Sequence, residues 1–474
     1  MSATRTTRLV LLSAAGALLV AGSAVAGVYL LRSRQNVTTS SSEALRYYRV
    51  ARENEDKLYS KDASAAYAKA LEHDPNFVMA TLRLARLLSD KDPDRARQLV
   101  QTVSRHRDEV TGRERLFIDI VTEQMGARDP QKLTALYDEF RRRYPEDVEG
   151  YTLRGQFLMR QGKQAEAAAE YEKALAINPN YAFGYNMLGY HWMSQGDYAK
   201  SEECFKKYRF LAPDQANPHD SLGELYAALG RYDEAEVSLL KALSVKPDFF
   251  ASMGHLGTVE VGRGNFPKAA ELFLKTAEVV ETGPMRFEFQ VASSFCLLEA
   301  GEQAKARERF EAAASEVASL GNGKEKFREL DVTLFRAAML AHQGEFATAK
   351  EHLTRAEELC AKLDPKKKGR RVEAALAFVR AGLLSAEGKL EEAAVEYAAH
   401  LEKVPSQGIE SLPYFDFYTL GRVDYAALLV KLGRLDDAKA ALAPILEKNP
   451  NFKPALTVLA TIGPEAPKPD VPRA

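Results

Sequence analysis

The stretch LGYHWMSQGDYAKSEECF, from Leu188 to Phe205, gathers a histidine, a tryptophan, a cysteine and two glycines within eighteen residues. This composition suits either an enzyme loop or one copy of a repeated scaffold. The glycines favour the scaffold, because they recur along the chain at a period of 34 residues. A fixed period of this length indicates stacked supersecondary units. The two glycine series are Gly155, Gly189, Gly223 and Gly257, and Gly162, Gly196, Gly230 and Gly264.

Each 34-residue repeat predicts two amphipathic helices that pack as a pair. The second glycine series falls in the turn between them, where a left-handed backbone is easiest without a side chain. On the second helix a small residue allows close approach, and a large residue four positions on fills the core from the same face. Prolines end that helix, because proline cannot continue the hydrogen-bond ladder. The small residues, large residues and prolines are Ala167, Ser201, Ala235 and Ala269; Tyr171, Phe205, Leu239 and Phe273; and Pro145, Pro179, Pro213 and Pro247.

These residues resemble the tetratricopeptide repeat family, whose pattern is an aromatic residue, Leu-Gly, an aromatic residue, and then alanine, an aromatic residue, alanine and proline. The resemblance implies an all-α, right-handed superhelical solenoid of helix-turn-helix repeats. The segment 111–247 is also similar to the repeat arrays linked to bacterial Ser/Thr kinases and regulators, here without a kinase domain. One repeat matches at Tyr185, Leu188, Gly189, Trp192, Ser201, Phe205, Tyr208 and Pro213, with serine and tyrosine in the two alanine places.

The repeats predict the organisation of most of the chain. Residues 43–282 form 34-residue repeats, clearest over 148–281, and residues 283–461 form longer repeats with a capping helix at the end. In this second segment the turn glycines lie 43 to 45 residues apart, at Gly301, Gly344, Gly388 and Gly433. We count about eleven repeats in all. Four prolines within residues 462–474 predict a disordered tail.

The amino-terminal residues predict a membrane segment. After a short basic stretch, 1–8, residues 9–31 form a run of 23 without a charge, followed by a polar linker, 32–42. As a helix the run would span roughly 35 Å, enough for the bilayer core. A cleaved signal peptide is the alternative, because Ala24-Val25-Ala26 fits a cleavage pattern, although the apolar run continues past it. The sequence therefore predicts a single-pass membrane protein with its repeats on the exported (periplasmic) face, and arginines on both sides of the run leave the orientation open.

Charge, cysteine use and motifs exclude several function classes. The formal net charge is -1, from 65 basic and 66 acidic residues that are interspersed, so nucleic-acid binding is not predicted. The three cysteines are far apart, which argues against a disulfide framework and a zinc site. His106-Arg107-Asp108 spells a kinase triplet, but Arg113 stands where asparagine is required. No catalytic constellation is found, so we predict no enzyme, no cofactor and no metal site.

The resemblance also implies which residues bind a partner, because the first helices of this family line the concave surface. That surface would carry aromatic, methionine and amide groups, which suit a protein or an extended peptide. No cation stands at the family's carboxylate-clamp positions, and Asp220 and Glu224 favour a partner with basic or amide groups. The predicted partner-binding residues are Gln156, Arg160, Phe183, Asn186, Met187, Tyr190, Met193, Asn217, Asp220, Glu224 and His255.

The function predicted from these features is that of a membrane-anchored scaffold. It would bind a partner protein or peptide in the concave groove of the superhelix and perform no chemistry of its own. The alternative is a ligand-sensing regulatory module, in which the repeats of residues 284–450 close on a small molecule. Saturable thermal stabilisation by a metabolite would favour the sensor over the scaffold.

Overall fold

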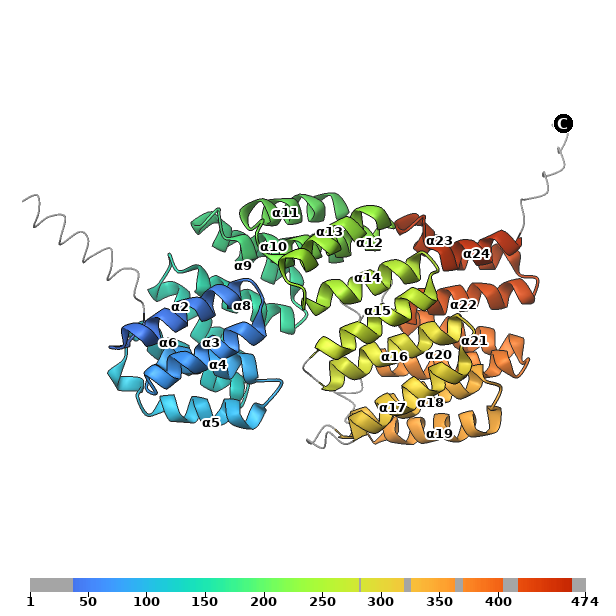
Figure 1. Ribbon diagram of the computed structural model, residues 1–474, viewed down its shortest axis with the longest axis horizontal. Helices are drawn as coiled ribbons and strands as arrows, with labels where there is room; N and C mark the ends of the chain where they lie inside the picture. The colour runs from blue at the N-terminus through green and yellow to red at the C-terminus, as the bar shows by residue number, and fades with distance from the viewer. Residues whose placement is uncertain (1–36, 281–282, 319–324, 363–369, 404–416, 463–474) are drawn as a thin grey trace, which may run out of the picture. The chain divides into compact units, whose positions relative to one another are not determined.

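The computed structural model describes residues 37–280, 283–318, 325–362, 370–403 and 417–462 (Figure 1). These residues form 23 α-helices and one short 3-10 helix, and they contain no β-strand. The helices belong to two compact units, Met1–Pro179 (unit 1) and Asn180–Ala474 (unit 2). The all-α class predicted from the repeats is confirmed.

Unit 1 contains four helix pairs, with the short helix η1 (Arg107–Glu109) before the third. The pairs are α2 (Ser42–Asp56) with α3 (Ser60–His73), α4 (Val78–Leu88) with α5 (Pro93–Ser104), α6 (Gly112–Met125) with α7 (Pro130–Arg143), and α8 (Val148–Arg160) with α9 (Gln164–Ile177).

Unit 2 contains seven helix pairs and a final single helix, α24 (Lys453–Ile462), close to the capping helix expected from the sequence. The pairs are α10 (Ala182–Ser194) with α11 (Tyr198–Leu211), α12 (Ala216–Ala228) with α13 (Tyr232–Val245), α14 (Phe250–Gly262) with α15 (Phe266–Val279), α16 (Gly283–Glu299) with α17 (Gln303–Ala318), α18 (Glu325–His342) with α19 (Phe346–Ala361), α20 (Arg370–Ala386) with α21 (Leu390–Lys403), and α22 (Phe417–Lys431) with α23 (Leu435–Lys448).

The longer period after residue 283 comes partly from longer helices. The first helices α16, α18 and α20 have 17, 18 and 17 residues, whereas α8, α10, α12 and α14 have 13 each. The turn geometry does not change. The turn glycines of both kinds of repeat have φ between 71° and 80°, the left-handed region that favours glycine.

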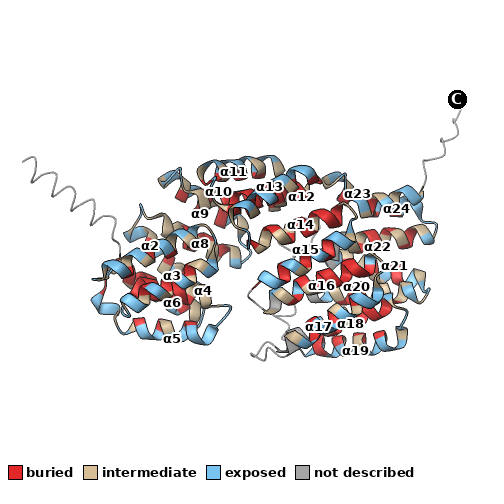
Figure 2. Ribbon diagram, in the orientation of Figure 1, coloured by how far each residue is buried: buried red, intermediate tan, exposed pale blue. Residues whose placement is uncertain are grey.

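Helices of a pair touch where glycine on the first helix meets a large side chain on the second. A Cβ atom on Gly223 would lie 2.6 Å from the side chain of Leu239, and one on Gly155 would lie 2.8 Å from the ring of Tyr171. Both large side chains are buried, and Figure 2 shows buried residues along the faces where helices meet. Glycine is therefore required by close packing at these crossings, as the sequence pattern predicts.

In unit 2 the first helices form the inner layer of the stack. Helix α12 contacts both α10 and α14, and α18 contacts both α16 and α20. The second helices of the described ranges make no comparable contacts with one another. A stack curves toward the layer whose members lie closer together. The first helices α10, α12 and α14 therefore line the inner face of their part of unit 2.

The last repeat of unit 2 closes back on the turn between α12 and α13. Tyr232 donates its hydroxyl to Oδ1 of Asn449 at 3.1 Å, and Nδ2 of Asn449 donates to the carbonyl of Ala227 at 3.4 Å. Asn451 donates to the carbonyl of Gly230 at 3.0 Å. We call these three hydrogen bonds the closing contact. They join residues more than two hundred positions apart, so they hold α23 and α24 in place from outside their own repeat.

The predicted localisation, a single-pass membrane protein, has to be corrected. Within the described ranges no helix combines the length and the apolar character needed to cross a bilayer, which takes about 20 predominantly apolar residues. The basic stretch 1–8, the predicted anchor 9–31 and the residues 463–474 of the predicted tail lie outside the described residues. The membrane and periplasmic assignment therefore has no structural support, and we do not retain it.

Substituting Gly189 tests the close packing of a helix pair. Gly189→Ala is expected to destabilise unit 2 by about 1–3 kcal/mol, because the new methyl group would overlap the ring of Phe205. Urea denaturation followed by circular dichroism measures the loss. The control is Gly196→Asn in the adjacent turn, where no atom lies within 4 Å and asparagine tolerates the positive φ. Equal losses in the two variants would contradict the packing explanation.

Removing two side-chain amides tests the closing contact. The double variant Asn449→Ala, Asn451→Ala is expected to accelerate amide hydrogen exchange in α23 and α24, because three hydrogen bonds to the distant turn are lost. Hydrogen-exchange mass spectrometry measures the exchange rates of these two helices. The matched control is Asn76→Ala in unit 1, an exposed residue of the same Pro-Asn-Phe turn type. Unchanged exchange in α23 and α24 would show that the contact does not restrain them.

Candidate functional site

A polar cluster lies on the inner face of unit 2, across three neighbouring first helices. It consists of Tyr190 on α10, Asp220, Ser221 and Glu224 on α12, and His255 on α14, and we call it the inner-face cluster. Asp220 and Glu224 are four residues apart, so both carboxylates lie on one face of α12. The close packing of the pairs brings α10, α12 and α14 side by side and lets these side chains meet.

Hydrogen bonds connect the cluster from repeat to repeat. The Tyr190 hydroxyl donates to Oε2 of Glu224 at 2.8 Å and to Oγ of Ser221 at 3.3 Å. Nδ1 of His255 lies 3.0 Å from Oδ1 of Asp220, which also accepts a hydrogen bond from Ser252 at 2.7 Å. Nε2 of His255 lies 3.7 Å from Oε2 of Glu224. The cluster thus places one imidazole between two carboxylates.

The charges in the cluster shift one another's protonation. Burial disfavours the imidazolium form of His255, but the charges of Asp220 and Glu224 outweigh it and raise the pKa of His255 to about 9. Burial raises the pKa of Glu224 above its usual range, against the opposing charge of His255. Burial, together with the charge of Glu224, raises the pKa of Tyr190 well above its ordinary value. His255 is therefore charged at neutral pH in this environment.

Four of the predicted partner-binding residues are buried. Asn186, Met193, Asn217 and Asp220 are only 3%, 2%, 6% and 2% exposed. Asn186 accepts a hydrogen bond from Ser221 at 3.0 Å, and Asn217 donates to the Tyr208 hydroxyl at 3.2 Å. These side chains connect helices to one another, so a partner has little access to them.

Five other predicted residues in unit 2 remain partly exposed. Phe183, Met187 and Tyr190 follow one another at spacings of four and three residues, which places them on one face of α10. Glu224 and His255 keep 13% and 14% of their side-chain surface exposed. The structure therefore leaves a narrower accessible set than the sequence predicts, with an apolar part on α10 and a charged part on α12 and α14.

The remaining two predicted residues, Gln156 and Arg160, lie on α8 of unit 1. Gln156 accepts a hydrogen bond from Arg86 at 3.1 Å, and Arg160 is exposed. These two residues therefore belong to unit 1, whereas the inner-face cluster belongs to unit 2.

Unit 1 has a buried charge network of its own, which the sequence does not reveal. Arg83 on α4 is 2% exposed and forms ion pairs with Glu149 and, at 3.1 Å, with Glu55. Burial opposes ionisation of Glu55, but the charges of Arg83 and Arg52 outweigh it and lower the pKa of Glu55 to about 2. The Arg83 guanidinium also donates to the Tyr48 hydroxyl at 3.1 Å. Since these charges are paired inside the unit, their role is structural.

Sequence reasoning missed Ser252 and the grouping of Asp220, Glu224 and His255. Ser252 and Ser221 are fully buried and position Asp220 and Tyr190 through hydrogen bonds. The repeat period could have revealed that Asp220 and His255 lie close together. His255 follows Asp220 by 35 residues, one repeat plus one position, so the two occupy adjacent places on neighbouring first helices.

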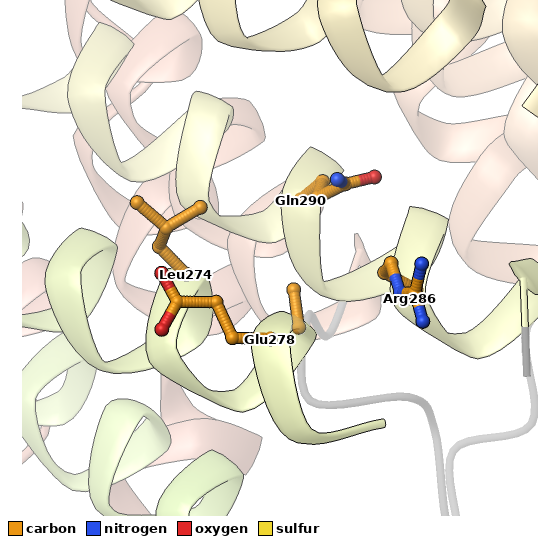
Figure 3. A pocket seen from close by; sticks show the side chains of 5 residues that line it. Leu274, Glu278, Arg286 and Gln290 are labelled. Carbon is orange, nitrogen blue, oxygen red and sulfur yellow. The ribbon is translucent and has the colours of Figure 1, made fainter. Parts of the chain in front are cut away.

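A cavity of about 300 Å³ lies between α15 and α16 (Figure 3). Leu274, Ala277 and Glu278 line it from α15, and Arg286 and Gln290 line it from α16. It lies at the start of the segment for which ligand sensing is the alternative prediction. However, Arg286 already forms an ion pair with Glu316 at 2.7 Å, and Gln290 donates to the same carboxylate at 3.1 Å. The cavity therefore gives ligand sensing no specific support.

The raised pKa of His255 predicts a pH-dependent stability. Because the folded-state pKa exceeds the ordinary value of about 6.5, the stabilisation is complete below that pH and is lost as pH rises through about 9. His255→Gln is expected to flatten the fall in melting temperature between about pH 7 and 9. Differential scanning fluorimetry across that range measures how the melting temperature changes with pH.

The control for this pH dependence is His219→Gln on α12. Burial lowers the pKa of His219, so its charge does not change in the same pH window. The melting temperature of the His219 variant should change with pH in the same way as that of the unaltered protein. Parallel slopes for the unaltered protein and His255→Gln would show that His255 does not carry the effect.

Comparisons with known proteins identify repeats in both units. Models of the tetratricopeptide repeat match residues 120–182, 218–249 and 330–355, and no kinase domain is among these matches. A search of curated proteins finds no match.

Several solved structures are similar to part of the chain. One from Pseudomonas aeruginosa, described as a functional characterisation of pilF, is 18% identical, covers 46% of this chain and 93% of its own, and has a TM-score of 0.36. A tetratricopeptide repeat protein from Parabacteroides merdae is 17% identical, with coverages of 58% and 98% and a TM-score of 0.40. YrrB, described as a TPR protein with an unusual peptide-binding site, is 18% identical, with coverages of 38% and 91% and a TM-score of 0.29. The three matching segments and the paired helices show that this chain carries tetratricopeptide repeats.

Proposed function

We propose that this chain is a protein-interaction scaffold that binds an extended segment of a partner protein on the inner face of unit 2. Its tetratricopeptide repeats support a role in protein–protein interaction. Proteins built from such repeats are generally non-enzymatic scaffolds, and we propose no reaction. The observation that carries the proposal is the accessible part of the inner face, where apolar and charged side chains lie on adjacent first helices.

The apolar part of this surface is formed by Phe183 and Met187 on α10. Both side chains are half-buried, so part of each is accessible to a partner. Methionine adapts to the shape of an apolar partner side chain, and aromatic residues supply large contact areas. Neither residue has a charged or hydrogen-bonding group to satisfy. These two side chains therefore suit an apolar anchor residue of a partner.

The charged part of the surface is formed by Glu224 and His255, with Asp220 behind them. Two carboxylates face one imidazole, so the cluster carries excess negative charge even when His255 is protonated. A partner with lysine, arginine or amide groups next to its apolar anchor would complement it. The hydrogen bonds from Tyr190 and Ser252 hold the carboxylates in position before a partner arrives. This preorganisation reduces the entropic cost of binding.

Met187 suits a photo-crosslinking group better than Tyr190. The Tyr190 hydroxyl is bonded to Glu224, so replacing Tyr190 would disturb the cluster. A photo-crosslinking amino acid at Met187 is half-buried on the same face and leaves the cluster intact. The control position is Phe210 on the second helix α11, where the side chain is 75% exposed.

Crosslinking at Met187 is expected to capture a discrete partner segment that is absent at Phe210. Mass spectrometry identifies the segment, and a synthetic peptide of that sequence is then titrated against the purified protein by fluorescence anisotropy. Met187→Ala is expected to weaken peptide binding about tenfold, the loss typical of one anchor contact. Identical products at Met187 and Phe210, or a peptide whose affinity is unaffected by Met187→Ala, would refute binding at this face.

A further inference from the structure

We propose that Asp220, Glu224 and His255 form a binding site for one divalent transition-metal ion. The three residues offer two carboxylate oxygens and one imidazole nitrogen, and these donor atoms all lie within 4.8 Å of one another. The proposal goes beyond partner binding and does not depend on it. It rests on the donor geometry, on the residues that orient the donors and on the charge of the cluster.

The spacing of the donors suits a common ion. Nε2 of His255 and Oε2 of Glu224 are 3.7 Å apart, too far for a hydrogen bond. Two donors at about 2.1 Å from a tetrahedral zinc ion are about 3.4 Å apart, so this pair needs to close by only a few tenths of an ångström. Asp220 and Glu224 lie one helical turn apart on α12 and face His255 together. Only one nitrogen of His255 can bind a given ion, and the three donor atoms lie within 4.8 Å of one another, so the widest pair would close by up to about 1.4 Å on binding.

Neighbouring residues orient the donors as outer-shell groups do in metal sites. Ser252 donates to Oδ1 of Asp220 at 2.7 Å, and Tyr190 donates to Oε2 of Glu224 at 2.8 Å. The other oxygen of each carboxylate, Oδ2 of Asp220 and Oε1 of Glu224, accepts no hydrogen bond from any described residue. Hydrogen bonds that orient ligands in this way typically raise metal affinity 10–100-fold. Each carboxylate is thus oriented by a hydrogen bond to one of its oxygens.

The charge of the cluster also favours a cation. The two carboxylates carry a charge of about −2, and His255 binds an ion only after it releases its proton, so a divalent ion would neutralise the cluster. One nitrogen and two oxygens suit Zn²⁺, Co²⁺ or Mn²⁺, whereas calcium takes six to eight oxygen ligands. The site is therefore assigned to a transition metal.

The test is Zn²⁺ binding by the full chain after dialysis against a chelator. Isothermal titration calorimetry is expected to show one ion per chain, and His255→Gln and Glu224→Gln should each weaken binding at least tenfold. The control is His106→Gln, because His106 is paired with a single carboxylate, Glu109, at 2.9 Å outside the site. This control variant should bind one ion with unchanged affinity.

Two further readouts separate metal binding from a purely structural ion pair. Zn²⁺ should raise the melting temperature of the unaltered protein and of His106→Gln, but not that of His255→Gln. Co²⁺ in the same protein should give visible absorption that His255→Gln lacks. Circular dichroism establishes that each variant is folded, and Glu224→Gln replaces His255→Gln if that variant unfolds. Absence of saturable Zn²⁺ binding, or binding that both variants retain, would overturn the proposal and leave a structural ion pair.

Discussion

The close approach of two helices within each repeat is the constraint on which the rest of this structure depends. At Gly223 and Gly189 the first helix has no side chain, and Leu239 and Phe205 of the second helix occupy the space. These contacts set the distance between the two helices of a pair. Repeats that carry this glycine therefore stack on the next repeat with similar geometry. The inner face, its polar cluster and the closing contact all follow from that regular stacking.

In the inner-face cluster, side chains proposed to bind a partner also join neighbouring repeats. The side chains expected to bind a partner are partly used to bond neighbouring repeats, as Asn217 is to Tyr208 and Tyr190 is to Glu224. Buried polar groups need such partners, since an unsatisfied one costs free energy. What remains accessible is an apolar pair on α10 beside an excess of negative charge.

The repeat pattern predicted the paired helices and the left-handed turns well, because each depends on contacts within one period. Small residues, glycines and prolines act locally, so their spacing is visible in the sequence. The accessible site was predicted less well. Burial of Asn186 and Asn217 depends on side chains of the adjacent repeat, and Arg83 in unit 1 is neutralised by residues from α2 and α8. A helix-by-helix analysis cannot assign such contacts.

The sequence by itself determined that this protein is an array of helix pairs, where each pair turns, and which residues fill its interior. Only the tertiary structure decided which side chains meet across repeats, such as His255 with Asp220, and that Asn449 returns to Tyr232. The physical reason is that stacking adds a small rotation at every repeat. A periodic pattern records the repeat but not the accumulated rotation, and that rotation places residues 217 positions apart within hydrogen-bonding distance.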